Sequence, residues 1–183
     1  MTTDEEMTDA AKRSLEFIEE FKSTAGESDR GLVITSAAHA EIYLEKILRA
    51  FLIEDGSADD LFEGPFAPFG TFSGKIKAAY VLGLITKEER DDLDAMRKVR
   101  NVFAHELTAS FDHPDVKKLC AKKPINDGRL CDRDAFLHLA MNAVIHITYR
   151  DLSVRTQWKR EILTRDGASK LEDARREAAQ KPK

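Results

Sequence analysis

The sequence GLVITSAAHAEIYLEKILRAFLI, residues 31–53, is apolar on almost every side of a helix. Its stripe at helical spacing consists of Ala40, Leu44, Ile47, Leu48 and Phe51, widened by Ile34, Ala37 and Ile42. A helix that is apolar nearly all round belongs in the interior of a bundle. Of its polar residues, Glu45 and Arg49 stand four apart and form a favourable pair that needs no further role. The stretch therefore predicts the central helix of a helical bundle.

The rest of the chain also has helical periodicity, and no segment alternates apolar and polar residues for long. Further helices are expected at about 8–23, 73–82, 86–105 and 132–152, with a last helical segment from Val154. We therefore predict an all-α bundle of about six to eight helices. Residues 1–163 are expected to form a single domain, and the polar residues 164–183 a C-terminal tail that frays.

Local signals predict where the two middle helices end and begin. Gly83 is expected to end one helix as its C′ residue. Thr86 and Glu89 have the spacing of a capping box, which opens the next. After His105 the prolines predict irregular chain as far as Arg129.

Residues 55–74, DGSADDLFEGPFAPFGTFSG, contain four of the ten phenylalanines. These are Phe62, Phe66, Phe69 and Phe72. We expect the loop to fold back and to place these rings in the bundle, as compact long loops do. The alternative is an aromatic platform for stacking bases. Against it, no Lys or Arg lies among the rings before Lys75.

Composition limits the class of protein. The chain has 183 residues, the size of one domain, and a net charge of −4, which argues against a dedicated nucleic-acid binder. No apolar run approaches the roughly 18 residues of a membrane span, and the acidic residues 1–9 are unlike a signal peptide. Cys120 and Cys131 fit reduced thiols better than a zinc site. We expect a cytoplasmic protein that does not contact a membrane.

Direct DNA reading is expected to be weak or absent. Residues 75–101 have the outline of a helix-turn-helix, but the first turns of its second helix, residues 87–92, hold four acids among six residues. Carboxylates at that position repel phosphates. Residues 150–183 carry ten basic and six acidic residues, so this arm could touch phosphates, although its charges are mixed rather than blocked.

The stretch RKVRNVFAH, residues 97–105, has two possible readings. In an RNA-cutting enzyme without metal, His105 would act as general acid or base, Arg100 would stabilise the developing charge, and Asn101 would orient the phosphate. Arg100 and His105 point about 140° apart on an ideal helix, so they converge only if the helix ends near Ala104 or a second copy takes part. In the other reading, His105 caps carbonyl groups while Arg97 and Arg100 pair with acids.

A polar pocket inside the bundle is the third candidate site. His138, Asn142 and His146 follow one another at four-residue steps on one helix. If they face the same cleft as the central helix and the 97–105 stretch, a pocket results. Its residues would be His39, Glu41, Tyr43, Arg97, His138, Asn142 and His146. His138 and His146 lie about 12 Å apart along a helix, too far for one metal ion, so we expect neither metal nor cofactor.

Three segments resemble the mannitol operon repressor family. They are AHAEIYLEK at 38–46, LFEGPFAPFGTF at 61–72 and RKVRNVFAH at 97–105, within a similarity that covers roughly residues 28–155. The resemblance implies an all-helical cytoplasmic protein tied to transcriptional repression of a mannitol-uptake operon. Because that family has no recognisable DNA-binding motif, it also implies repression through a protein partner.

The spacing of Arg100, Asn101 and His105 also resembles the Arg-x4–6-His signature of the HEPN superfamily of helical bundles. This second resemblance implies an RNase, or a partner of a nucleotidyltransferase, whose active site is built across a homodimer. Since a fold alone does not establish an activity, the sequence favours a non-enzymatic regulator that contacts another protein. The alternative is a metal-independent RNase centred on these three residues.

Overall fold

The predicted central helix is present as α2, Asp29–Phe51, in a computed structural model that describes residues 19, 26–121 and 133–154. The side chain of Ser28 caps the helix by accepting the N–H of Gly31 at 3.2 Å. Nine residues of α2 are buried: Leu32, Val33, Ser36, Ala37, Ala40, Leu44, Ile47, Leu48 and Phe51. Because this buried face is so wide, α3, α4 and α6 all pack against α2.

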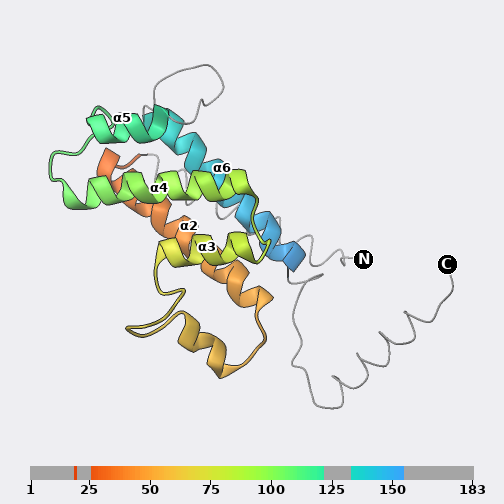
Figure 1. Cartoon of the computed structure of the whole chain (residues 1–183). Coiled ribbons are helices and arrows are strands. Elements are labelled where there is room, and N and C mark those ends of the chain that lie inside the picture. The colour runs from red at the N-terminus through yellow and green to blue at the C-terminus, as the bar shows by residue number, and fades with distance from the viewer. Residues whose placement is uncertain (1–18, 20–25, 122–132, 155–183) are drawn as a thin grey trace, which may run out of the picture.

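The described residues form five α-helices and one 3-10 helix, without a strand among them (Figure 1). After α2 these are η1 Gly56–Leu61, α3 Phe72–Val81, α4 Lys87–His105, α5 Pro114–Ala121 and α6 Arg133–Ser153. The prediction of an all-α bundle is confirmed. The helix expected at 8–23 lies outside the described part except for Glu19, which is helical and exposed. Residues 155–183, which include most of the expected C-terminal arm and the whole tail, also lie outside it, so the extent of the domain stays a prediction.

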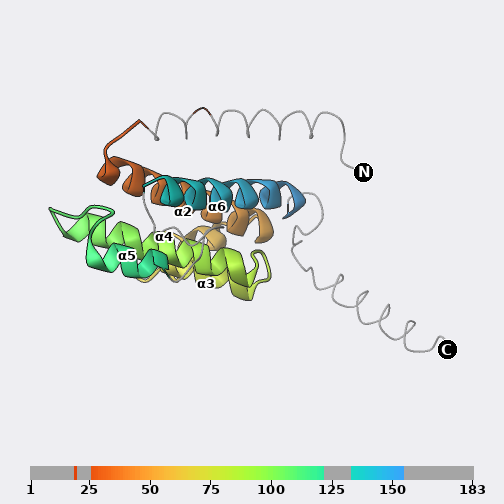
Figure 2. The same cartoon turned by 90° about the horizontal axis from the view of Figure 1, so that it is seen from above.

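The helices lie in two layers. Seen from above, α2 and α6 form one layer and α3, α4 and α5 form the other (Figure 2). Arg133 at the start of α6 bonds to Asp29 at the start of α2, 3.1 Å away, so these two helices are parallel. Arg150 near the end of α6 bonds to Glu89 at the start of α4, so α4 runs the opposite way. None of the described helices is both long and apolar enough to pass through a bilayer.

The turn between α3 and α4 follows the local signals. Gly83 has a φ of 75°, and the N–H groups of Gly83 and Leu84 bond back to the carbonyls of Tyr80 and Ala79. This is the Schellman arrangement that a C′ glycine permits. The capping box of Thr86 and Glu89 is also complete. Both local predictions are confirmed.

The segment after His105 differs from the prediction, because residues 114–121 form helix α5. Pro114 was read as a turn signal, yet it is the first residue of the helix. Proline suits that position because the first helical N–H has no partner within the helix. Phe111, buried just before α5, packs against Phe103 of α4 and Phe136 of α6, with ring centroids 5.4 and 5.7 Å apart.

The phenylalanine-rich loop is only partly folded back. Phe62 and Phe72 are buried, and Phe69 is partly buried against the core. Phe66, by contrast, is 94% exposed. The expectation that all four rings enter the bundle is therefore wrong for Phe66, whose backbone lies on a turn that points it outward.

Candidate functional site

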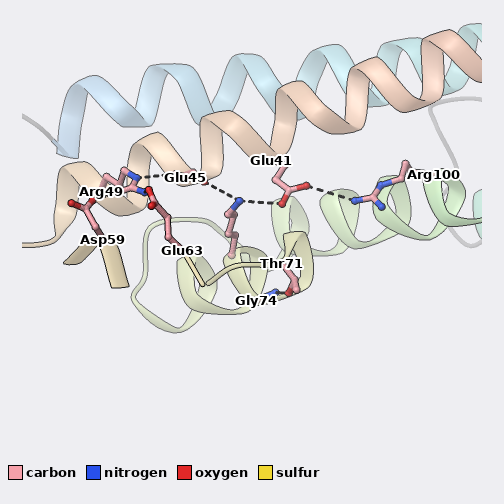
Figure 3. Close-up of polar contacts among 9 residues, drawn as sticks. Glu41, Glu45, Arg49, Asp59, Glu63, Thr71, Gly74 and Arg100 are labelled. Atoms are coloured by element: carbon pink, nitrogen blue, oxygen red, sulfur yellow. Dashed lines mark hydrogen bonds and ion pairs between the residues drawn. The ribbon is translucent and has the colours of Figure 1, made fainter. Parts of the chain in front are cut away.

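A row of alternating charges, which we call the charge row, crosses the bundle from α4 to η1 (Figure 3). Glu41 of α2 lies at its centre, 3.6 Å from Arg100 of α4 and 3.0 Å from Lys75 of α3. Lys75 also contacts Glu45 at 2.9 Å. The predicted pair of Glu45 and Arg49 is present at 2.8 Å. The row thus joins three helices through their side chains.

The row continues into the chain after α2. Arg49 pairs with Asp59 of η1, and Glu63 lies 3.7 Å away. Its guanidinium also stacks over the ring of Phe62 at 4.1 Å. A guanidinium bound on its edge by carboxylates and on its face by a ring has little freedom. Arg49 therefore fixes η1 and Phe62 against α2.

Lys75 is the buried cation of the row, with only 7% of its surface exposed. Burial would lower the pKa of Lys75, but its hydrogen bonds to Glu45 and Glu41 outweigh this and raise it. Burial likewise opposes ionisation of Glu45, yet Lys75 and Arg49 lower the pKa of that carboxyl. Sequence reasoning missed Lys75. The available signal was its position, since a lysine three residues after Phe72 shares the buried face of α3.

Arg100 and His105 occupy positions on different sides of α4. Helix α4 continues through His105, and the N–H of Glu106 still bonds to the carbonyl of Val102 at 2.9 Å. The two side chains therefore keep their separation of about 140° around the axis. Arg100 turns toward Glu41, whereas His105 is exposed at the last residue of the helix and Asn101 is half-buried. His105 is thus the last residue of the helix, one position after Ala104, and catalysis by this pair stays a prediction.

The other arginines near this stretch also have partners. Arg97 binds Asp94 one turn earlier through two nitrogens, at 3.0 and 2.7 Å. Arg30 of α2 donates to the carbonyls of Phe103, Glu106 (2.7 Å) and Leu107 (2.9 Å). The carbonyl groups that end α4 are thus satisfied from another helix, a task that the polar reading gave to His105. No sequence signal points to Arg30, because it lies 73 residues from Phe103.

The residues of the predicted polar pocket are spread over α2, α4 and α6. His138 and Asn142 are exposed on α6, while His39 and Tyr43 are half-buried on α2. His146 contacts Glu89 at 3.3 Å, at the start of α4. Glu41, by contrast, contacts Arg100, also of α4. Along the axis of α4, Arg100 lies about 16 Å from Glu89. A pocket that joins these residues stays a prediction.

Glu89 combines two tasks, because it completes the capping box and binds α6. Burial alone would raise the pKa of Glu89, but the N–H of Thr86, Arg150 and His146 outweigh burial and lower it. Because its pKa is lowered, the ionised carboxyl of Glu89 stabilises the fold at any pH above 4.5, the usual pKa of a glutamate. This stabilisation is lost as the pH falls through the pKa of the folded state.

We expect Glu89→Gln to lower the unfolding free energy at pH 7 by about 1–2 kcal/mol, because the neutral amide lacks the additional strength that hydrogen bonds to a charged group have. The difference from wild type should shrink as the pH falls below about 4.5 and through the lowered pKa of the folded carboxyl, because its charge is lost over that range. Urea unfolding from pH 3 to pH 7 measures both effects. Asp60→Asn, on an exposed residue, is the control and should follow the wild-type curve. A constant difference across this pH range would contradict the assignment.

Glu106, His113 and Asp115 offer ligand atoms within 4.8 Å of one another, which raises the question of a metal ion. However, Nδ1 of His113 accepts the N–H of Asp115 at 3.3 Å and so caps α5. An unprotonated Nδ1 leaves the proton on Nε2, which lies 2.6 Å from Glu106. A metal-bound histidine instead uses its second nitrogen as a donor. We therefore interpret these residues as the cap of α5.

Comparison of the chain with models of known protein families gives no match. Comparisons with curated proteins and with solved structures also give no match.

Proposed function

We propose that the chain is a cytoplasmic, non-enzymatic regulator that acts through a partner protein, as its resemblance to mannitol operon repressors implies. The observation that carries this proposal is the arrangement of Arg100 and His105. Arg100 is held toward Glu41, and His105 points to another side of α4. A general acid and a charge-stabilising group must converge on one phosphate to cleave RNA, and within one chain they diverge.

The start of α4 supports contact with a protein rather than with DNA. Its first turn carries Glu88 and Glu89, and Glu89 is committed to Thr86 and Arg150. A DNA-reading helix needs donors such as Arg, Lys or Asn at its first turns. The acids there favour a role that does not require phosphate contact.

Transcription of a mannitol-uptake operon tests the regulator. Deleting the gene in its host should raise the transcript, and restoring the wild-type chain should lower it again. The purified chain alone should leave operon DNA unshifted in a gel at physiological salt. An unchanged transcript would overturn the link to the operon. A shift by the chain alone would overturn action through a partner.

The alternative is a metal-independent RNase built from two copies. Two observations favour it: His105 is exposed, and the contact between Arg100 and Glu41 is long at 3.6 Å. In a homodimer, Arg100 and Asn101 of one copy could face His105 of the other, which the resemblance to the HEPN superfamily implies. The RNase would cleave RNA, whereas the regulator would leave it intact, so the two functions make opposite predictions.

We expect RNA to stay intact when it is incubated with the wild-type chain in the presence of EDTA, because no catalytic pair is assembled. The measurement is a cleavage gel with wild type, His105→Ala and, as a matched control, His138→Ala, whose histidine is exposed on α6. Cleavage by wild type and His138→Ala but not by His105→Ala would replace the regulator with the RNase. A size measurement of the same samples would then show whether two copies are required.

A further inference from the structure

Phe66 is the most unusual apolar side chain of the loop between α2 and α3, since it is 94% exposed while its neighbouring rings are buried or half-buried. Single exposed apolar residues are common on protein surfaces and need no explanation by themselves. Here the backbone around it is held at many points. We call residues 61–70 the Phe66 loop.

Backbone hydrogen bonds close the Phe66 loop. The N–H of Phe69 bonds to the carbonyl of Leu61 at 2.8 Å, so the two ends of the loop are joined. Within it, the N–H of Ala67 reaches the carbonyl of Gly64 at 3.4 Å, which places Phe66 in the middle of a turn. Gly64 has a φ of 97°, a conformation that favours glycine.

Side-chain contacts and the neighbouring helix α3 also hold the Phe66 loop in place. The rings of Phe62 and Phe69 meet edge to face, with centroids 5.5 Å apart, and Arg49 covers Phe62. The loop also rests directly on α3, because a Cβ at Gly74 would lie 2.5 Å from the carbonyl oxygen of Pro68. Prolines at 65 and 68 restrict the backbone on both sides of Phe66. The ring is thus displayed on a rigid support, which lowers the entropy lost on binding.

The segment of chain that carries Phe66 is acidic. The chain between Arg49 and Lys75 carries five acids and no basic residue. These acids, Glu54, Asp55, Asp59, Asp60 and Glu63, are all exposed. Arg49 compensates part of this charge through Asp59 and Glu63, which leaves the segment that carries Phe66 with a net negative charge.

We propose that the Phe66 loop is the docking surface of the chain for a partner protein that offers an apolar pocket bordered by Lys and Arg. This inference rests on the proposed regulator and names the chemistry of its partner. A buried aromatic anchor inside a polar rim is the usual composition of an interface hot spot. The negative charge of this exposed segment selects a basic partner and speeds its approach, and it repels nucleic acid.

The test begins with a photoreactive residue. p-Benzoylphenylalanine is placed at position 66 of the full chain in living cells and, as a control, at Val81, which is also exposed but lies at the far end of α3. One protein should be captured from position 66 and not from position 81. That protein is then purified, and its affinity is measured for wild type, Phe66→Ala and Asp60→Lys.

Phe66→Ala should weaken binding at least about 30-fold, as expected for a hot-spot residue. Asp60→Lys should weaken it less and reduce its dependence on salt. The proposal is overturned by unchanged binding of Phe66→Ala, by equal capture at both positions, or by no capture. It is also overturned if position 66 captures only a second copy of this chain or its own basic C-terminal arm.

The outcomes separate this surface from the proposed function. If Phe66→Ala loses the captured protein but deletion of the gene leaves the operon transcript unchanged, the docking surface stands and the regulator falls. If deletion raises the transcript and Phe66→Ala represses like wild type, the regulator stands and this surface is not the one it uses.

Discussion

Replacing Phe103 with alanine is expected to lower the free energy of unfolding by about 4 kcal/mol, the cost of removing a fully buried aromatic ring. Phe103 is completely buried, and its ring is one end of the cluster that joins α4 to Phe111 and Phe136. The cavity would open between three elements at once, so no single side chain can move to fill it. Urea unfolding followed by circular dichroism measures the loss.

Phe66→Ala is the matched control for Phe103→Ala, because it removes the same atoms from an exposed position. It should change the unfolding free energy by less than about 0.5 kcal/mol. Losses of similar size in the two variants would show that Phe66 is packed in solution. That result would also remove the basis of the proposed docking surface.

Lys75→Met is expected to have the second-largest effect on stability. Methionine fills most of the space of the lysine chain but leaves Glu41 and Glu45 without their shared cation. Removing one partner of a fully buried ion pair costs about 3–5 kcal/mol. Because the two glutamate side chains are 24% and 30% exposed, water screens part of the penalty and we expect about 2–3 kcal/mol.

The pH dependence identifies the cause of the loss in Lys75→Met. In the wild type, the lowered pKa of Glu45 means that its stabilising contribution is present above 4.5 and is lost as the pH falls through the folded pKa. The difference between variant and wild type should therefore narrow below about pH 4.5. Lys77→Met, on an exposed residue of α3, is the control and should stay close to wild type. A Lys75→Met loss that does not depend on pH would point to packing instead of charge.

The parts of the fold that could be predicted are those fixed by neighbouring residues. The buried face of α2 follows from a repeat that the sequence carries without interruption, and the turn at Gly83 follows from one residue that permits a positive φ. Phe66 and Pro114 were misread for the opposite reason. Whether a ring is buried, or a proline begins a helix, depends on what packs beside it.

Of the candidate site, only the contacts between neighbouring residues of one helix could be predicted. The pair of Glu45 and Arg49 lies within one helix, so its spacing was sufficient. Lys75 and Arg30 act across helices, on carboxylates and carbonyl groups that are distant in the chain. The orientation of Arg100 toward Glu41 likewise depends on how α4 crosses α2, which periodicity does not encode.

The parallel pairing of α2 and α6 has a consequence for synthesis. Their starts are joined by residues 104 positions apart. At the usual pace of translation, roughly 5–20 seconds separate the emergence of the two residues from the ribosome. During that interval α6 is absent, so of the described helices that pack on the apolar face of α2, α3 and α4 alone can cover it. A message that stops before codon 133 therefore yields a nascent chain with an open core, a natural target for chaperones and proteases.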